Sequence, residues 1–174
     1  MARLWIPTAL LATALVAERT VARARSTPEV VAPPRTPVSS FIMTIGGEGG
    51  AVAVGEASYR RGPGGTQFSL ELGNRSGEGA VLFATEGAAP VAPGRYTVDD
   101  RPGRGALHAL VFTGTPSAPT GVYRVQGGVL TVRSIEAGQI EGSFELRALG
   151  FTAERPQQDD QVISVAGSFM ATER

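Results

Sequence analysis

Residues 139–149 read QIEGSFELRAL, so apolar or glycine positions alternate with polar positions along the stretch. A period of two is typical of a β-strand with one face in a core and the other in water. Another apolar stretch, residues 129–135, precedes it, and Glu136-Ala137-Gly138 lies between the two. Two strand patterns joined by a short turn with glycine predict an antiparallel hairpin. The buried face predicted for its second strand consists of Ile140, Gly142, Phe144, Leu146 and Ala148.

The closing apolar stretch, residues 162–171, repeats a feature of this hairpin. Gly142-Ser143-Phe144 in the hairpin has a counterpart in Gly167-Ser168-Phe169. A glycine two places before an aromatic residue on the same strand face leaves room for a ring from a neighbouring strand. We therefore predict that the two strands pair, with each phenylalanine near the glycine of the other strand.

The rest of the chain has short apolar stretches between clusters of Gly, Pro, Asn and Asp, without sustained helical periodicity. Gly46-Gly47-Glu48-Gly49-Gly50 is one such cluster, and it predicts a turn because glycine has the greatest backbone freedom. The pattern predicts an all-β protein, an antiparallel β-sandwich of about ten short strands, with a closed lipocalin-like β-barrel as the alternative. The other predicted strands are residues 38–45, 51–59, 66–72, 80–84, 95–98, 107–113 and 122–125.

Residues 1–24 have the layout of an export signal. Arg3 precedes an uncharged apolar stretch, residues 4–17, which is shorter than the 20 or so residues of a membrane-spanning helix. Ala22 and Ala24 form an Ala-x-Ala cleavage site, and a second such site lies inside the apolar stretch. We therefore expect a signal peptide that is cleaved after residue 24.

Residues 25–37 are rich in proline and poor in large apolar side chains, which predicts a disordered linker. Residues 38–172 are then a single all-β domain, large enough to bury a core without disulfides. We expect the mature protein to be secreted or periplasmic, with no membrane span after removal of the signal.

Composition argues against several classes of function. The chain has no cysteine, one histidine, and 16 basic and 16 acidic residues. A formal net charge of zero argues against nucleic-acid binding. The lack of cysteine excludes disulfides, thiolate metal sites and a lipid-attachment cysteine. We therefore predict neither a cofactor nor a metal.

Four short segments resemble known proteins. The segments are RYTV at residues 95–98 after Pro93-Gly94, GVLTV at 128–132, IEGSF at 140–144 and GSF at 167–169. Over about residues 93–171, the chain resembles small exported bacterial β-rich domains of uncharacterised families, many of them lipoproteins. That class has no established activity, so the resemblance implies an exported β-domain and no catalytic residue. The chain departs from many of these proteins because it lacks the lipid-attachment cysteine.

A serine hydrolase would have to use His108, the only histidine of the chain. Asp99 or Asp100 would orient its ring, and one of several serines would be the nucleophile. The sequence has no Gly-x-Ser-x-Gly motif, and Leu110 and Phe112 share the strand face of His108. We interpret His108 as a residue with satisfied hydrogen bonds in the core or at an interface.

Acidic pairs occur at Asp99-Asp100 and Asp159-Asp160, and neither has the ligand spacing of a calcium loop. We interpret both as turn residues, because short acidic side chains bond their own backbone. Glu141 and Glu145 lie on the polar face of the hairpin. We interpret four arginines as solvated turn residues and not as an anion site; they are Arg60, Arg61, Arg101 and Arg104.

We assign no catalytic, cofactor-binding or metal-binding residue and predict that the protein is not an enzyme. The favoured function is a non-catalytic binding or structural module of the bacterial cell envelope, with an envelope protein or a carbohydrate as partner. One alternative is an extracytoplasmic hydrolase that uses His108. The other is a carrier of small apolar ligands in a barrel cavity lined by Phe68, Phe83, Leu110 and Phe144.

Overall fold

The structure is a computed structural model that describes residues 39–47, 50–65, 67–73, 79–86, 92–100, 107–115, 118–153 and 161–174. The predicted signal peptide, residues 1–24, and the predicted linker, residues 25–37, lie outside the described residues.

Nine β-strands and one short 3₁₀ helix, η1 (Pro63–Gly65), form the regular structure of the described residues. The all-β class predicted from the sequence is confirmed. The strands are β1 (Ser40–Gly46), β2 (Ala51–Arg61), β3 (Gln67–Gly73), β4 (Gly79–Glu86), β5 (Gly94–Val98), β6 (Leu107–Thr115), β7 (Ala118–Glu136), β8 (Gln139–Thr152) and β9 (Gln161–Glu173).

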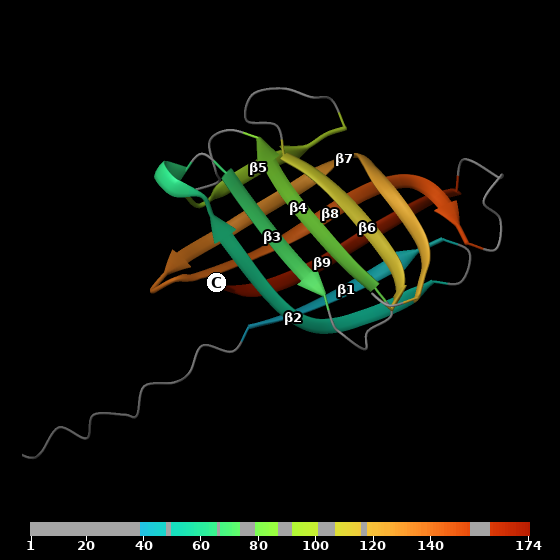
Figure 1. The fold of residues 1–174 in the computed structure, drawn as a ribbon, viewed down its shortest axis with the longest axis horizontal. Helices are drawn as coiled ribbons and strands as arrows, with labels where there is room; N and C mark the ends of the chain where they lie inside the picture. Colours follow the sequence, from blue (N-terminus) through green and yellow to red (C-terminus); the bar gives the residue numbers. More distant parts are fainter. Residues whose placement is uncertain are drawn as a thin grey trace, which may run out of the picture. The chain divides into compact units, whose positions relative to one another are not determined.

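The strands form one sheet that closes on itself. Its order is β1-β2-β3-β4-β6-β5-β7-β8-β9, and β9 pairs again with β1. Strands that pair over many residues run antiparallel. Two short pairings, of β2 with β9 and of β5 with β6, are parallel. In Figure 1, β3, β4 and β6 form a front wall that crosses the wall of β7, β8 and β9 behind it.

The two walls pack on one core, as in the predicted sandwich, and hydrogen-bonded strands also join them. Phe83 of β4 and Phe144 of β8 lie on strands that are not neighbours in the sheet, yet their ring centroids are 5.6 Å apart in an edge-to-face arrangement. This contact therefore crosses the interior. The bulkiest fully buried side chains are Tyr59, Phe68, Phe83, Phe144, Met43 and Leu70.

Strand β7 is longer than the sequence predicts, because the predicted strands 122–125 and 129–135 are parts of one strand. Gly127 and Gly128 lie between the two predicted strands, but the pairing with β8 continues past them and only shifts its register between Val125 and Gly127. A Cβ atom at Gly128 would meet the carbonyl oxygen of Glu145. The glycine there permits close approach of β8 and does not end the strand.

The predicted pairing of the two Gly-Ser-Phe segments is confirmed. In the antiparallel register of β8 and β9, Gly142 lies opposite Phe169, and Phe144 lies opposite Gly167. A Cβ atom at Gly142 would lie 2.7 Å from Cζ of Phe169, and one at Gly167 would lie 2.7 Å from Cζ of Phe144. Each ring thus lies over the glycine of the other strand.

The sheet also has a seam where the end of β2 meets the end of β9. Ser58 pairs with Thr172 and Tyr59 with Glu173 in the parallel direction. The Glu173 carboxylate accepts hydrogen bonds from the Arg61 guanidinium at 3.1 and 3.0 Å, and from the Tyr59 hydroxyl at 3.4 Å. A bidentate arginine–carboxylate pair therefore joins the two strands.

The Glu173→Gln variant is expected to be slightly less stable than the wild type at neutral pH and equally stable in acid. The hydrogen bonds from Arg61 hold the pKa of Glu173 below its ordinary value. A lowered folded-state pKa stabilises the protein above the unfolded-state value, and the contribution is lost as pH falls through the folded-state value. The difference should therefore shrink as pH falls from neutral through the ordinary range of a glutamate carboxyl, about 4.3, and disappear at still lower pH.

Urea unfolding midpoints across this pH range measure the effect. Glu145→Gln, at an exposed position of β8, is the control and should leave the midpoint unchanged at both ends of the range. If the urea midpoint of Glu173→Gln stays equally far below that of the wild type in acid, the result would contradict the role of the carboxylate charge.

Candidate functional site

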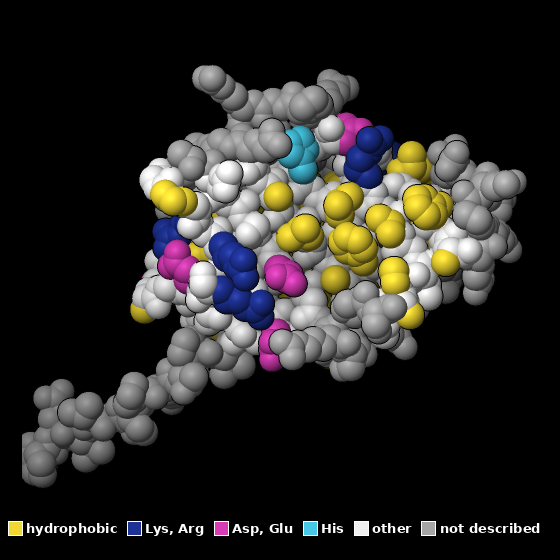
Figure 2. All heavy atoms as spheres, in the orientation of Figure 1, with side chains coloured by type: hydrophobic (Ala, Val, Ile, Leu, Met, Phe, Trp, Pro, Cys, Tyr) yellow, Lys and Arg dark blue, Asp and Glu magenta, His cyan; other side chains and the backbone are white. Residues whose placement is uncertain are grey.

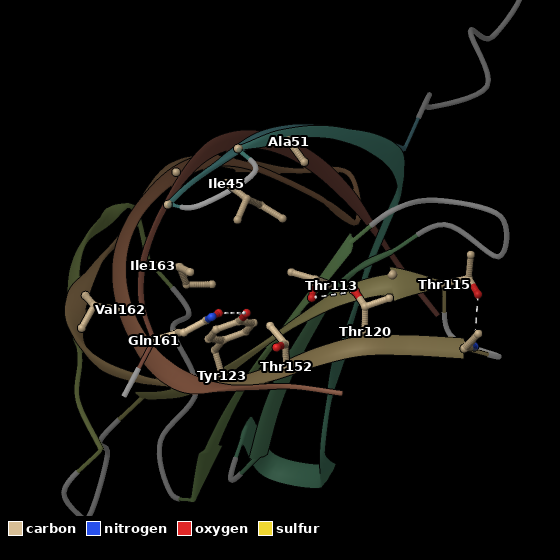
Figure 3. A pocket seen from close by; sticks show the side chains of 15 residues that line it. Ile45, Ala51, Thr113, Thr115, Thr120, Tyr123, Thr152, Gln161, Val162 and Ile163 are labelled. Atoms are coloured by element: carbon tan, nitrogen blue, oxygen red, sulfur yellow. Dashed lines mark hydrogen bonds between the residues drawn. The ribbon is translucent and has the colours of Figure 1, made fainter. Parts of the chain in front are cut away.

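A pocket of about 750 Å³ lies at one end of the closed sheet. It is surrounded by the ends of β1, β6 and β8 and by the starts of β2, β7 and β9. Figure 3 shows this pocket, which we call the end pocket, from close by. Side chains from all six strands line it, among them Ile45, Ala51, Thr113, Tyr123, Thr152 and Gln161.

The alternation of the strands carries polar side chains into the end pocket. Ile163 faces the core, so Gln161, two positions earlier on β9, also faces the interior. Likewise, Thr113 follows the buried Val111 on β6 by two positions. These polar residues are not among the candidate residues predicted from the sequence. Extending the apolar alternation to the strand ends is the signal that would have found them.

An irregularity between β6 and β7 shapes the rim of the end pocket. The register shifts between Thr113 and Gly114, and Gly114 has a φ of +78°. A Cβ atom at Gly114 would lie 2.7 Å from both the Ala118 carbonyl oxygen and the Thr120 amide nitrogen. Glycine is therefore required here, both for its positive φ and for the close approach of the two strands.

Two hydrogen-bonded pairs of neutral side chains follow one another along the pocket wall. The Thr120 hydroxyl donates to the Thr113 hydroxyl at 3.1 Å, and the Thr113 side chain lies next to that of Tyr123. The Tyr123 hydroxyl donates to Oε1 of Gln161 at 3.4 Å. Figure 3 marks both bonds with dashed lines. Hydroxyl groups both donate and accept, so these pairs can reorient toward a ligand.

Tyr123 lies at the inner end of the pocket and is 3% exposed. Burial raises the pKa of its hydroxyl, and the neighbouring Thr113 side chain has the smaller, opposite effect. The hydroxyl is therefore a neutral donor at physiological pH. A Cβ atom at Gly121 would lie 2.7 Å from both the Tyr123 ring and Oγ1 of Thr113, so this glycine leaves space for the two side chains.

The described lining of the end pocket has hydroxyl, amide and apolar groups and no formal charge. A charged ligand would lose its hydration without gaining an opposite charge from these residues. In the part of the chain that the structure describes, no three His, Cys, Asp or Glu side chains gather to hold a metal ion. The pocket has the size of a small-molecule site and suits a neutral ligand with hydroxyl groups.

His108 is half-buried on the outer face of β6 and has a hydrogen-bond partner. Its Nδ1 lies 2.9 Å from the backbone carbonyl oxygen of Asp99. A carbonyl oxygen only accepts, so Nδ1 carries the proton and donates it. The Asp99 amide also donates to the Leu107 carbonyl oxygen at 3.0 Å, and the Asp100 carboxylate lies 3.8 Å from the Arg124 guanidinium. The bond from His108 therefore ties the segment after β5 to β6.

The four side chains predicted to line a carrier cavity do not share one. Phe68, Phe83 and Phe144 are buried in the core, where Phe83 and Phe144 contact each other. Leu110 is 37% exposed on the outer face of β6, so its prediction as a cavity residue was wrong. The reason is that residues 107–113 are apolar on both strand faces, so alternation alone does not distinguish inside from outside.

The other charged candidates lie on the surface or outside the described residues. Arg61 belongs to the β2–β9 seam, and Arg60 is exposed on β2. Glu141 accepts a hydrogen bond from Arg133 at 3.3 Å, and Glu145 is exposed on β8. The predicted turn residues Asp159, Asp160, Arg101 and Arg104 lie outside the described residues.

Within the described ranges, no helix has the length and apolar character needed to cross a membrane. The likeness of residues 93–171 to exported bacterial β-domains stays a prediction. Comparison of the chain with family models, curated proteins and solved structures finds no match.

Proposed function

We propose that this chain is an exported, non-catalytic binding protein of the bacterial cell envelope that holds a small carbohydrate in the end pocket. The observation that carries the proposal is the pocket of about 750 Å³, whose described lining is uncharged and rich in hydroxyl groups. Export is inferred from the predicted signal at residues 1–24.

The chemistry of the lining matches that of a sugar. The hydroxyls of Thr113 and Thr120 and the amide of Gln161 can donate and accept hydrogen bonds, as ring hydroxyls do. Ile45 and Ile163 offer apolar surface to the C–H groups of a sugar ring. A fatty-acid carboxylate or a phosphate would lack a cationic partner among the described lining residues.

A thermal-unfolding panel tests the proposal. We expect neutral mono- and disaccharides to raise the melting temperature, while fatty acids, inorganic phosphate and calcium leave it unchanged. A ligand at 100 times its dissociation constant adds about 2.7 kcal/mol, or roughly 5 to 10 °C for a domain of this size. A flat response to the sugars in a protein that melts cooperatively would overturn the proposal.

Three variants locate the bound sugar. Thr113→Val removes one hydroxyl from the pocket wall and should weaken sugar binding about tenfold. Ala51→Phe fills the pocket and should abolish binding. Thr44→Val, on the exposed face of β1, is the matched control and should bind like the wild type. A sugar-induced shift that survives in full in Ala51→Phe would place the sugar elsewhere on the protein.

A further inference from the structure

The outer surface of β3, β4, β6 and the first half of β7 carries exposed apolar side chains. Leu82 and Leu110 are each 37% exposed. Figure 2 shows hydrophobic side chains gathered on this side of the molecule, and Figure 1 shows β3, β4 and β6 in the same orientation. We call the surface of Ala80, Leu82, Leu110, Phe112 and Val122 the outer apolar face. Contiguous exposed apolar surface of this kind is typical of a protein interface.

One row of cross-strand neighbours crosses the outer apolar face with opposite charges at its ends. Glu71 lies opposite Leu82, Leu82 opposite Leu110, and Leu110 opposite Arg124. Adjacent strands are about 4.8 Å apart, so the two charged positions lie about 14 Å apart with two leucines between them. The row consists of an acidic residue, two leucines and a basic residue. When two copies of the row face each other in opposite directions, each charge lies against the opposite charge and leucine lies against leucine.

A second row of cross-strand neighbours lies beside the first, with small side chains on β3 and β4 and bulky side chains on β6 and β7. A Cβ atom at Gly73 would lie 3.5 Å from Cβ of Ala80, so these small residues are neighbours on β3 and β4. Ala80 lies opposite Phe112 on β6, and Phe112 lies opposite Val122 on β7. A hollow of about 880 Å³ extends over the small residues, with Phe112 among its lining. One half of the row is hollow, and the other half carries bulky side chains.

We propose that the outer apolar face binds a second copy of this chain, with the two-fold axis running along the strands between β4 and β6. This operation places Glu71 against Arg124 of the partner subunit, and Leu82 against Leu110 of the partner subunit. It also places Phe112 over Ala80 of the partner subunit. One operation thus matches opposite charges in the first row and matches bulky with small side chains in the second row, as an isologous interface requires.

The two charges at the ends of the row are available to a partner. The Glu71 carboxylate lies 4.0 Å from the Arg174 guanidinium, and the Arg124 guanidinium lies 3.8 Å from the Asp100 carboxylate. These exposed pairs are long and contribute little to stability. The side chains of Glu71 and Arg124 are 64% and 66% exposed. In the dimer, Glu71 and Arg124 of the partner subunit would lie among apolar side chains that exclude water. Exclusion of water strengthens the attraction between the two charges.

Sedimentation velocity of the purified protein from about 5 to 500 µM tests the dimer over the range of weak to moderate affinities. The wild type should shift from monomer to dimer as the concentration rises. Glu71→Arg and Arg124→Glu each place like charges together twice in the dimer, and each should weaken dimerisation at least tenfold. An equimolar mixture of the two variants should dimerise again, because one has two cations in the row and the other has two anions.

Two controls reverse exposed charges away from the row, Glu145→Arg on β8 and Arg95→Glu on β5, and both should dimerise like the wild type. Residues 1–38 are common to all variants, so any association through them cannot distinguish the variants. Circular dichroism and cooperative melting establish that each variant is folded. A wild type that stays monomeric throughout, single variants that dimerise like the wild type, or a mixture that stays monomeric would overturn the proposal.

Discussion

The Phe144→Ala variant should lose about 3 to 5 kcal/mol of unfolding free energy, a large share of the stability of a domain of this size. The Phe144 ring contacts Phe83 across the interior at 5.6 Å and lies 6.5 Å from the Phe169 ring on β9. The surrounding sheet is closed by hydrogen bonds, so its walls have little freedom to move inward and fill the space. Most of the cavity should therefore persist, and the loss should lie toward the upper end of the range.

The same strand supplies the control for this experiment. Phe151 also lies on β8 but faces outward and is 44% exposed, so Phe151→Ala should cost less than about 1 kcal/mol. Urea unfolding of the two variants beside the wild type measures both values. Similar losses at the two positions would mean that the interior is not packed around Phe144 as the structure has it.

The strands whose alternation is clear were the ones that the sequence predicted best. The alternation in residues 139–149 identified the buried face of β8, and the repeated Gly-Ser-Phe segments identified its register with β9. Both signals are local, because one face of each strand is buried and each ring needs a glycine opposite it. The spacing of the turns was enough to predict the all-β class.

Local sequence patterns did not predict the features that depend on contacts between distant segments. Gly127 and Gly128 lie between the two strands predicted at 122–125 and 129–135, whereas in the structure β7 continues through them and β8 approaches Gly128 closely. The return of β9 to β1, which closes the sheet, joins distant segments and leaves no signal in either strand. Residues 107–113 are apolar on both faces because the outer apolar face lies on β6, so Leu110 could not be placed from its neighbours.

The end pocket depends on where three strands end and three others begin, and sequence patterns define strand boundaries least well. Gln161 and Thr113 are polar residues that continue apolar inward rows. In the sequence, Thr113 ends the predicted strand 107–113, and Gln161 belongs to a polar loop before the predicted strand 162–171. Only the closed sheet shows that those strand ends meet around one space, which is why no site residue there was predicted from the sequence.

Gly142→Ala should lower the unfolding free energy by about 2 to 3 kcal/mol, although it adds only a methyl group. The added Cβ atom would meet the backbone carbonyl oxygen of Thr131 and would lie 2.7 Å from Cζ of Phe169. The first contact requires β7 to move, and the second requires the ring to leave its position over the glycine. Urea unfolding measures the loss. Gly127→Ala is the control, because it makes the same change in backbone entropy. A Cβ atom at Gly127 would have open space, so this variant should be neutral or slightly stabilising.

A double-mutant cycle with Phe169→Leu separates the ring from the backbone. Leucine lacks the Cζ atom that the new methyl group would meet, so Phe169→Leu should cost less in the Gly142→Ala background than in the wild type. A coupling free energy of about 1 kcal/mol or more would mean that the glycine is there to accommodate the ring. If the two losses simply add, the Thr131 carbonyl accounts for the whole effect. The Gly-Ser-Phe repeat would then have predicted the pairing of β8 and β9 without contributing to its stability.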